Sequence, residues 1–117
     1  MKKVSAAWLA GVIDSDGCLF FNAQRKNICW KRCQITVCNT NLTLIHKAQN
    51  LMGGYISMRK PKKDKLIQHR KIMYQLRESA HLKCLTLLKQ LLPYLTAKKN
   101  YAKQMVTFIK KGKWEKR

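Results

Sequence analysis

The sequence predicts an α+β fold in which helices cover one face of a four-stranded antiparallel sheet. The chain has 117 residues, a length that fits one domain over residues 1–117 with a single modest core. Its apolar residues switch between a helical period and a strand period in the order α-β-β-α-β-β-α-α. No linker, low-complexity tract or long repeat interrupts this order, so one layered domain is expected.

The elements follow from local signals along the chain. Ser5 can cap a first helix whose apolar run covers residues 6–13, and Gly17 ends it. Gly53 and Pro93 end later helices. The remaining elements are strands over 19–25 and 28–38 with a turn around Lys26 and Asn27, a helix over Leu42–Met52 capped by Thr40 or Asn41, strands over 55–60 and 71–77, and helices over 79–92 and 97–111.

The charge balance of the chain is extreme. Twenty-five Lys/Arg oppose five Asp/Glu, for a formal net charge of +20, while a hydrophobic content of 46% excludes a disordered basic tail. Such an excess indicates a polyanionic partner, either nucleic acid or an anionic membrane surface. The cations concentrate in strands, loop and tail rather than opposite bulky apolar residues of a helix, so we expect nucleic acid and no membrane contact.

Cysteine usage and the N-terminus bear on the compartment. No apolar run reaches ~18 residues and no secretory signal is recognisable, so we expect an intracellular protein of the cytoplasm, nucleoid or an organelle, not a secreted one. The odd number of cysteines fits reduced thiols. A zinc site of Cys29, Cys33, Cys38 and His46 lacks the usual ligand spacing, so small buried or half-buried thiols are favoured.

One face of the predicted sheet is polar and free of acids. Amides, hydroxyls and guanidiniums are the groups that read base edges in the major groove. The predicted DNA-binding residues of this face are Asn22, Gln24, Trp30, Arg32, Gln34, Thr36, Ser57, Arg59, Gln75 and Arg77. The basic loop over residues 59–65, continued by residues 69–71, has the composition of a phosphate clamp.

Two of the acids share one short window at the end of the first helix. Asp14 and Asp16 lie where the helix dipole is already negative, so each carboxylate costs a few tenths to ~1 kcal/mol. A bound divalent cation would reverse that balance, and hard oxygen ligands suit Mg²⁺ or Ca²⁺. Ala7, Ala10 and Gly11 form a small-residue stripe that would let a second helix pack closely, as in a dimer interface.

The segment from Leu9 to Gly17, Leu-Ala-Gly-Val-Ile-Asp-Ser-Asp-Gly, resembles the signature of the LAGLIDADG homing endonucleases. It differs from the signature only by Val12 for Leu and Ser15 for Ala. Residues 91–99 resemble a second element of that family, and the likeness extends over nearly the whole chain. It implies an αββαββα core with a saddle-shaped antiparallel sheet over DNA. Because the chain has one signature copy, it also implies a homodimer.

The resemblance assigns roles to the two acids. Asp16 matches the metal-binding and catalytic carboxylate, and Gly17 matches a position whose carbonyl can approach the metal. Asp14 matches an acid that is more structural than catalytic. The implied cofactor is Mg²⁺, with Ca²⁺ or Mn²⁺ able to substitute in the site.

The resemblance also implies two further catalytic residues. Lys98 matches the active-site lysine, with Lys99 as the alternative if the register slips by one. Asn39 is the nearest match to a polar residue that is usually Gln, and Thr40 and Asn41 are nearby candidates. Asn is the shorter side chain, so this position departs from the family pattern.

The implied function is a site-specific double-strand DNA endonuclease of intron mobility, which hydrolyses phosphodiesters at a long near-palindromic site. The first alternative is a non-cutting relative on the same scaffold, either a maturase that binds intron RNA or a DNA-binding regulator. The second is a fragment of a two-copy enzyme or an RNA-binding protein of another kind.

Overall fold

The structure is a computed structural model that describes residues 1–24, 30–60 and 72–111. Its elements follow the predicted order, with one added 3-10 turn, and confirm the α+β fold class. They are α1 (Lys3–Asp16), β1 (Gly17–Gln24), β2 (Trp30–Asn39), α2 (Leu42–Met52), β3 (Tyr55–Arg59), β4 (Met73–Glu78), α3 (His81–Leu91), η1 (Leu92–Tyr94) and α4 (Lys99–Lys111). Across the described ranges, no helix has the length and apolar character needed to cross a membrane.

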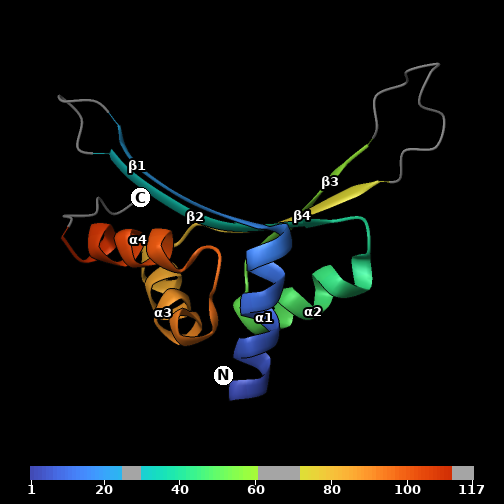
Figure 1. Cartoon of the computed structure of the whole chain (residues 1–117). Coiled ribbons are helices and arrows are strands. Elements are labelled where there is room, and N and C mark those ends of the chain that lie inside the picture. The colour runs from blue at the N-terminus through green and yellow to red at the C-terminus, as the bar shows by residue number, and fades with distance from the viewer. Residues whose placement is uncertain (25–29, 61–71, 112–117) are drawn as a thin grey trace.

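The strands form one antiparallel sheet in the order β1-β2-β4-β3. β2 pairs with both β1 and β4, so strands that lie before and after α2 in the sequence become neighbours. Figure 1 shows a curved sheet with all the helices on its convex side. The two ends of the sheet curve away from the helices. The sheet is therefore a saddle with one open, concave face.

The core lies between the sheet and the helices. Its largest fully buried side chains come from all four α-helices and the two central strands: Leu9, Ile13, Ile35, Val37, Ile45, Leu76, Cys84, Leu88, Leu91 and Met105. Burial of one large aliphatic side chain contributes ~1.5–3 kcal/mol relative to its exposure. Because Leu9 and Ile13 belong to this core, the C-terminal end of α1 is held against the middle of the sheet (Figure 1).

The start of α1 differs from the prediction. The helix begins at Lys3, and Lys2 occupies the N-cap position without a side-chain hydrogen bond, so the prediction of Ser5 as the cap is wrong. Ala6 and Leu9 are buried on the same face as Ala10 and Ile13. Tertiary packing of one helix face stabilises a first turn that has no capping side chain.

The later helix boundaries follow local hydrogen bonds. Asn41 rather than Thr40 caps α2, because its side-chain oxygen accepts the N–H of Thr43 at 3.0 Å. α3 begins at His81 rather than at Ser79, so that predicted start is wrong. The buried carboxylate of Glu78 accepts the Ala80 N–H at 3.1 Å, which keeps these residues in a turn before the helix.

Candidate active site and nucleic-acid interface

The candidate site lies where α1 passes directly into β1. Asp16 is the last residue of α1 and Gly17 the first of β1, so no loop separates helix from strand. A Cβ atom at Gly17 would lie 2.6 Å from the Ile13 Cα and 2.8 Å from its carbonyl oxygen. Only glycine lets the chain turn from helix to strand so closely. The turn places Asp16 beside the sheet, where β1 begins and β2 ends.

The structure brings together two of the predicted catalytic residues, Asp16 and Asn39. The Asn39 Nδ2 donates a hydrogen bond to Asp16 Oδ2 at 2.9 Å. The Asn39 Oδ1 accepts the Asn41 N–H at 2.7 Å, which fixes the orientation of the amide. Of the three polar candidates, Asn39 is the one in contact with Asp16. Asn41 caps α2, and Thr40 is exposed.

Asp14 has a different set of partners. Its two carboxylate oxygens accept the backbone N–H groups of Thr96 at 2.8 Å and of Lys98 at 3.0 Å. The Lys98 Nζ donates to the main-chain oxygen of Asp14 at 2.8 Å, so it caps a carbonyl in the last turn of α1. These bonds hold residues 96–98 in place and explain why α4 begins at Lys99 rather than at residue 97.

The unfavourable position of a carboxylate at the negative end of α1 is therefore offset differently for the two acids. The Asp14 carboxylate is half-buried and its two oxygens receive backbone donors, while the Lys98 cation neutralises the end of the same helix. The Asp16 carboxylate is exposed, and among the described residues its side chain accepts a hydrogen bond from the neutral Asn39 amide. Asp16 thus keeps an oxygen that can bind a cation.

The described residues of one chain offer a metal ion only part of its coordination. The described ranges contain no group of three or more His, Cys, Asp or Glu side chains that could hold an ion. Asp14 is committed to the 96–98 segment, which leaves the hard carboxylate oxygen of Asp16 and the adjacent Gly17 carbonyl. Such oxygen donors suit Mg²⁺, but a complete site needs further ligands from outside the described residues.

The strand register gathers the predicted DNA-binding residues on the concave face. Directly paired residues share a face, and the pairs on this side include Asn22 with Arg32, Phe20 with Gln34, Thr36 with Arg77, Ser57 with Gln75, and Arg59 with Met73. The side chains of Gln24 and Trp30 lie outside what the structure describes. Contact with DNA by all ten residues stays a prediction, and so does the basic loop, whose residues 61–71 also lie outside.

The predicted residues differ in how much surface they offer. Arg32, Arg59 and Arg77 are exposed, and so are Asn22 and Ser57. Thr36 and Gln75, at the centre of the sheet, retain only 5% and 9% of their surface. The arginines on both halves of the saddle are therefore the accessible cations of this face, whereas Thr36 and Gln75 line its floor.

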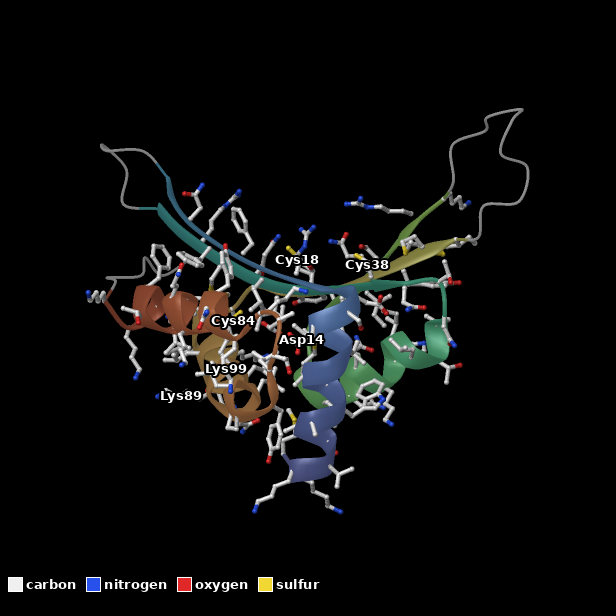
Figure 2. All side chains as sticks on the ribbon, in the orientation of Figure 1. Asp14, Cys18, Cys38, Cys84, Lys89 and Lys99 are labelled. Atoms are coloured by element: carbon white, nitrogen blue, oxygen red, sulfur yellow. The ribbon has the colours of Figure 1, made fainter. Side chains whose placement is uncertain are left out.

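The sequence interpretation missed the less polar members of the same face. The register adds Cys18, Phe20, Cys38, Tyr55 and Met73 to it. Tyr55 is 84% exposed, and Figure 2 shows the Cys18 and Cys38 labels on the side of the sheet away from the helices. A period of two continued from Asn22 back to Cys18 predicts two of these positions, but their apolar character suggests a core instead.

The small-residue stripe of α1 is only partly available to a partner. Ala7 and Gly11 are exposed, and no atom lies within 4 Å of a Cβ built on Gly11. Ala10 is fully buried in the core and leaves no surface for a second helix, and a dimer contact through this stripe stays a prediction. Val4, which is 81% exposed, extends the free side of the helix instead.

The described thiols lie in two separate places. Cys33 and Cys84 are buried in the core and Cys18 and Cys38 lie on the concave face. The hydrogen bond to Cys33 and burial both raise the pKa of the Cys84 thiol, which keeps that thiol protonated. Cys33 and Cys38 point to opposite faces of β2, so they cannot bind one zinc ion; Cys29 lies outside the described residues.

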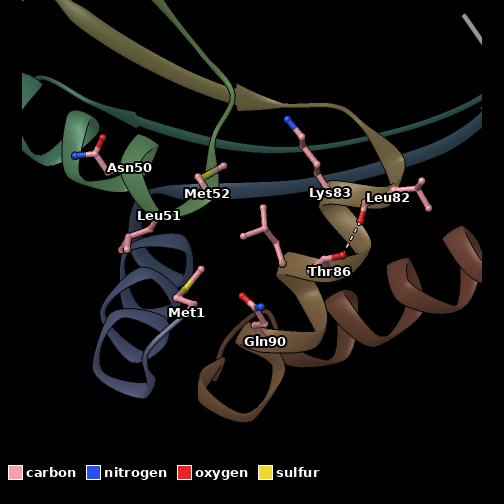
Figure 3. Close-up of a pocket in the computed structure, with 9 residues that line it drawn as sticks. Met1, Asn50, Leu51, Met52, Leu82, Lys83, Thr86 and Gln90 are labelled. Carbon is pink, nitrogen blue, oxygen red and sulfur yellow. Dashed lines mark hydrogen bonds between the residues drawn. The ribbon is translucent and has the colours of Figure 1, made fainter.

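A groove of about 520 Å³ opens on the helical side, between the start of α1, the end of α2 and α3 (Figure 3). Its lining residues are Met1, Asn50, Leu51, Met52, Leu82, Lys83, Thr86, Leu87 and Gln90. They include no acid, histidine or cysteine. The groove therefore offers no carboxylate, imidazole or thiol for metal binding, and the candidate site stays at the end of α1.

Comparisons with known proteins support a DNA-endonuclease fold. No family model and no curated protein matches the chain. Two solved structures of the homing endonuclease I-CvuI, one with its target in the presence of calcium and one with the I-CreI target in the presence of magnesium and the DNA not cleaved, match it at 27% and 28% identity. Their TM-scores are 0.70 and 0.68, over 92% and 93% of this chain and 67% and 68% of theirs.

A more distant structure shares the fold alone. It is an archaeal intron-encoded homing endonuclease, I-Vdi141I, complexed with DNA, with 12% identity and a TM-score of 0.66 over 94% of this chain and 69% of that one. The curved sheet, the helices behind it and the acidic end of α1 thus define the class, a homing-endonuclease fold that binds DNA in these relatives. With its Leu9–Gly17 segment, the chain is similar to the LAGLIDADG homing endonucleases of the single-motif type.

Proposed function

We propose that the chain is a metal-dependent, site-specific double-strand DNA endonuclease that acts as a homodimer. The observation that carries the proposal is the hydrogen bond between Asp16 and Asn39 at the α1–β1 junction. The Lys98 Nζ is held by the main-chain oxygen of Asp14, two residues before Asp16. An exposed carboxylate at the negative end of a helix is unfavourable for the isolated fold. It becomes favourable where a cation and a phosphate bind beside it.

DNA would bind in the concave face of the sheet. The exposed arginines Arg32, Arg59 and Arg77 are spread along both halves of the saddle, and no acid is found on the described part of this face. Guanidiniums can contact phosphates or guanine edges, whereas the amides of Asn22 and Gln34 suit adenine edges. A face of this length in each of two subunits would read roughly two helical turns, about 20 base pairs.

The homodimer would form along the free side of α1. Val4, Ala7 and Gly11 are exposed in one line on this helix, and a second copy of α1 could approach closely at the open space beside Gly11. A two-fold axis through this contact would bring the two Asp16 residues to a shared point. The second Asp16 would supply the ligand that one chain lacks.

At that point the residues of the chain would hold the metal ion, position water and neutralise charge on the phosphate. A bound Mg²⁺ supplies charge for activating water and for stabilising the leaving 3′ oxygen in such hydrolyses. Asp16 and the Gly17 carbonyl would hold it, and Asn39 would keep the Asp16 carboxylate oriented and position water. Lys98, as a fixed cation, would stabilise negative charge on the phosphate.

Incubation with a library of intron-insertion DNA, with Mg²⁺ or with EDTA, tests the proposal. We expect cutting only with Mg²⁺, and we expect Asp16→Asn to lower it by about 10³-fold while DNA binding stays nearly unchanged. Sedimentation should show a dimer at micromolar concentration, at least with DNA. Uncut DNA together with tight RNA binding would refute the nuclease and favour a maturase. Undiminished cutting by Asp16→Asn would refute the metal assignment.

A further inference from the structure

The helical side of the molecule carries a charge pattern that the proposed nuclease does not use. α2, α3 and α4 contain no Asp or Glu, whereas α2 contains one lysine, α3 two and α4 four. A surface selected for solubility alone mixes both signs. The concave sheet face, where the target duplex would bind, is on the other side of the domain (Figure 1). The excess of lysine on the helices therefore needs a separate reason.

The lysines of α4 are aligned. At ~100° per residue, Lys99, Lys103 and Lys110 fall within roughly 40° of one another around the helix axis, and we call these three residues the lysine stripe. Lys103 and Lys110 are exposed and Lys99 is half-exposed. The stripe runs along about 17 Å of helix at 1.5 Å per residue. One strand of a B-form duplex carries about five phosphates over that length.

The packing of α4 shows which way the stripe faces. The rings of Tyr101 and Phe108 each lie 5.0 Å from the ring of Phe21, which is on the helix-facing side of β1. At ~100° per residue, these two aromatic residues lie roughly 170° around the axis from the lysine stripe. The stripe is therefore turned away from β1 and from the concave face. Figure 2 likewise shows the Lys99 label on the helical side of the sheet.

The stripe is not explained by stability. Lys99 begins α4, where the helix dipole is positive, and a cation at that end is disfavoured by ~0.3–1 kcal/mol. Lys99 and Lys103 are spaced i, i+4, and like charges at this spacing repel by ~0.2–0.5 kcal/mol. No acid in the first turn of α4 offsets either effect. Lys110 lies in the last turn, where the helix dipole favours a cation, so the cost falls on Lys99 and Lys103. Cations kept at that cost fit a polyanionic ligand.

We propose that the lysine stripe binds the phosphodiester backbone of a second nucleic-acid segment, separate from the duplex on the sheet face. Lysine offers a point charge without the planar fork of arginine, and the exposed neighbours Asn100, Gln104 and Thr107 add hydrogen-bonding groups rather than aromatic stacking surfaces. The contact is thus to phosphates and independent of base sequence. A duplex seated in the concave face cannot reach the stripe without bending around the domain, and bending short DNA is costly.

Amine-specific acetylation read by mass spectrometry tests the location. The described cations at the centre of the sheet face are arginines, so this reagent does not report on them. The protein is first saturated with a DNA duplex of about 20 base pairs, and an RNA duplex of the same sequence is then added. Protection of Lys103 and Lys110 at the first step identifies DNA as the ligand, and protection only at the second identifies RNA. Unprotected Lys103 and Lys110 in both arms would overturn the proposal.

A paired variant makes the test quantitative. For the probe that protects the stripe, Lys103→Gln/Lys110→Gln should flatten the slope of log affinity against log salt by about 1.8, since each lost phosphate contact removes ~0.9. The control, Lys3→Gln/Lys83→Gln, removes the same charge from α1 and α3 and should leave the protection of Lys103 and Lys110 unchanged. An equal change of slope in both variants would mean diffuse attraction and no site. Magnesium-dependent cutting, which tests the nuclease, is read separately and should be equal in both variants.

Discussion

Asp14 and Asp16 lie two residues apart at the same helix end, yet the fold treats them in opposite ways. Asp14 is half-buried and binds a segment more than 80 residues away in the sequence, through the N–H groups of Thr96 and Lys98. Asp16 is exposed and touches only a neutral amide among the described side chains. The difference shows that a pair of acids in one motif can divide into a structural group and a chemical one, according to what the rest of the chain brings to each.

The largest effect on stability should come from Asp14→Ala. It removes an acceptor for two backbone N–H groups at 2.8 and 3.0 Å, and a charged hydrogen bond contributes ~1.5–3 kcal/mol. We expect the free energy of unfolding to fall by about 3 kcal/mol, measured by urea denaturation. Asp14→Asn, which keeps one acceptor, should fall about half as far. A loss under ~0.5 kcal/mol for Asp14→Ala would contradict the structural role.

Gly17→Ala probes the joint between the two acids and the sheet. The added Cβ would lie 2.6 Å from the Ile13 Cα, so the helix end or the strand must shift. Overpacking of this kind costs ~1–3 kcal/mol. Gly11→Ala is the matched control, because nothing lies within 4 Å of its added Cβ. In the monomer that variant should be neutral or slightly stabilised, since Ala favours a helix by up to ~1 kcal/mol.

Asn39→Ala should lower both stability and cutting. The loss of stability should be smaller than for Asp14→Ala, and the loss of cutting smaller than for Asp16→Asn. It removes the amide donor to Asp16 and the acceptor for the Asn41 N–H. Two ordinary hydrogen bonds near the surface contribute ~1 kcal/mol in all. We expect cutting to fall about tenfold through loss of Asp16 orientation. Parallel assays of DNA binding should show no change, and a large binding defect would place Asn39 in the interface instead.

Asp16→Asn should have the smallest effect on stability and one of opposite sign. Removal of a carboxylate from the negative end of α1 should raise the free energy of unfolding by ~0.3–1 kcal/mol at low salt. Denaturation with and without Mg²⁺ checks this result. Destabilisation of Asp16→Asn by as much as Asp14→Ala would remove the distinction between the two acids.

Local sequence signals predicted the order of the elements well and their ends less well. The Asn41 cap and the Gly53 stop lie within a few residues of the helix they bound, so short-range hydrogen bonding and backbone freedom decide them. The starts of α1 and α3 were missed, because packing of Ala6 and Leu9 and the Glu78 carboxylate override a serine cap. Boundaries that depend on tertiary partners cannot be read from propensity.

The site was predictable in composition but not in arrangement. The excess of cations and the acidic window are properties of the residues themselves, and the family resemblance supplied Lys98 and Asn39 as candidate catalytic residues. Ala10 looked equivalent to Ala7 and Gly11 in the sequence. Only the placement of α1 against the core showed that Ala10 is buried and that the other two are free.

By itself, the sequence determined the fold class, the excess of cations that predicts a polyanionic partner, and the two acids, because periodicity, net charge and residue type need no third dimension. The tertiary structure decided which acid is structural and which is open. It also decided that the residues of the concave face include Phe20 and Tyr55, and that the lysine stripe of α4 faces away from them. The physical reason is that hydrogen bonds, strand register and helix rotation join residues distant in the chain, and these relations exist only after the elements have packed.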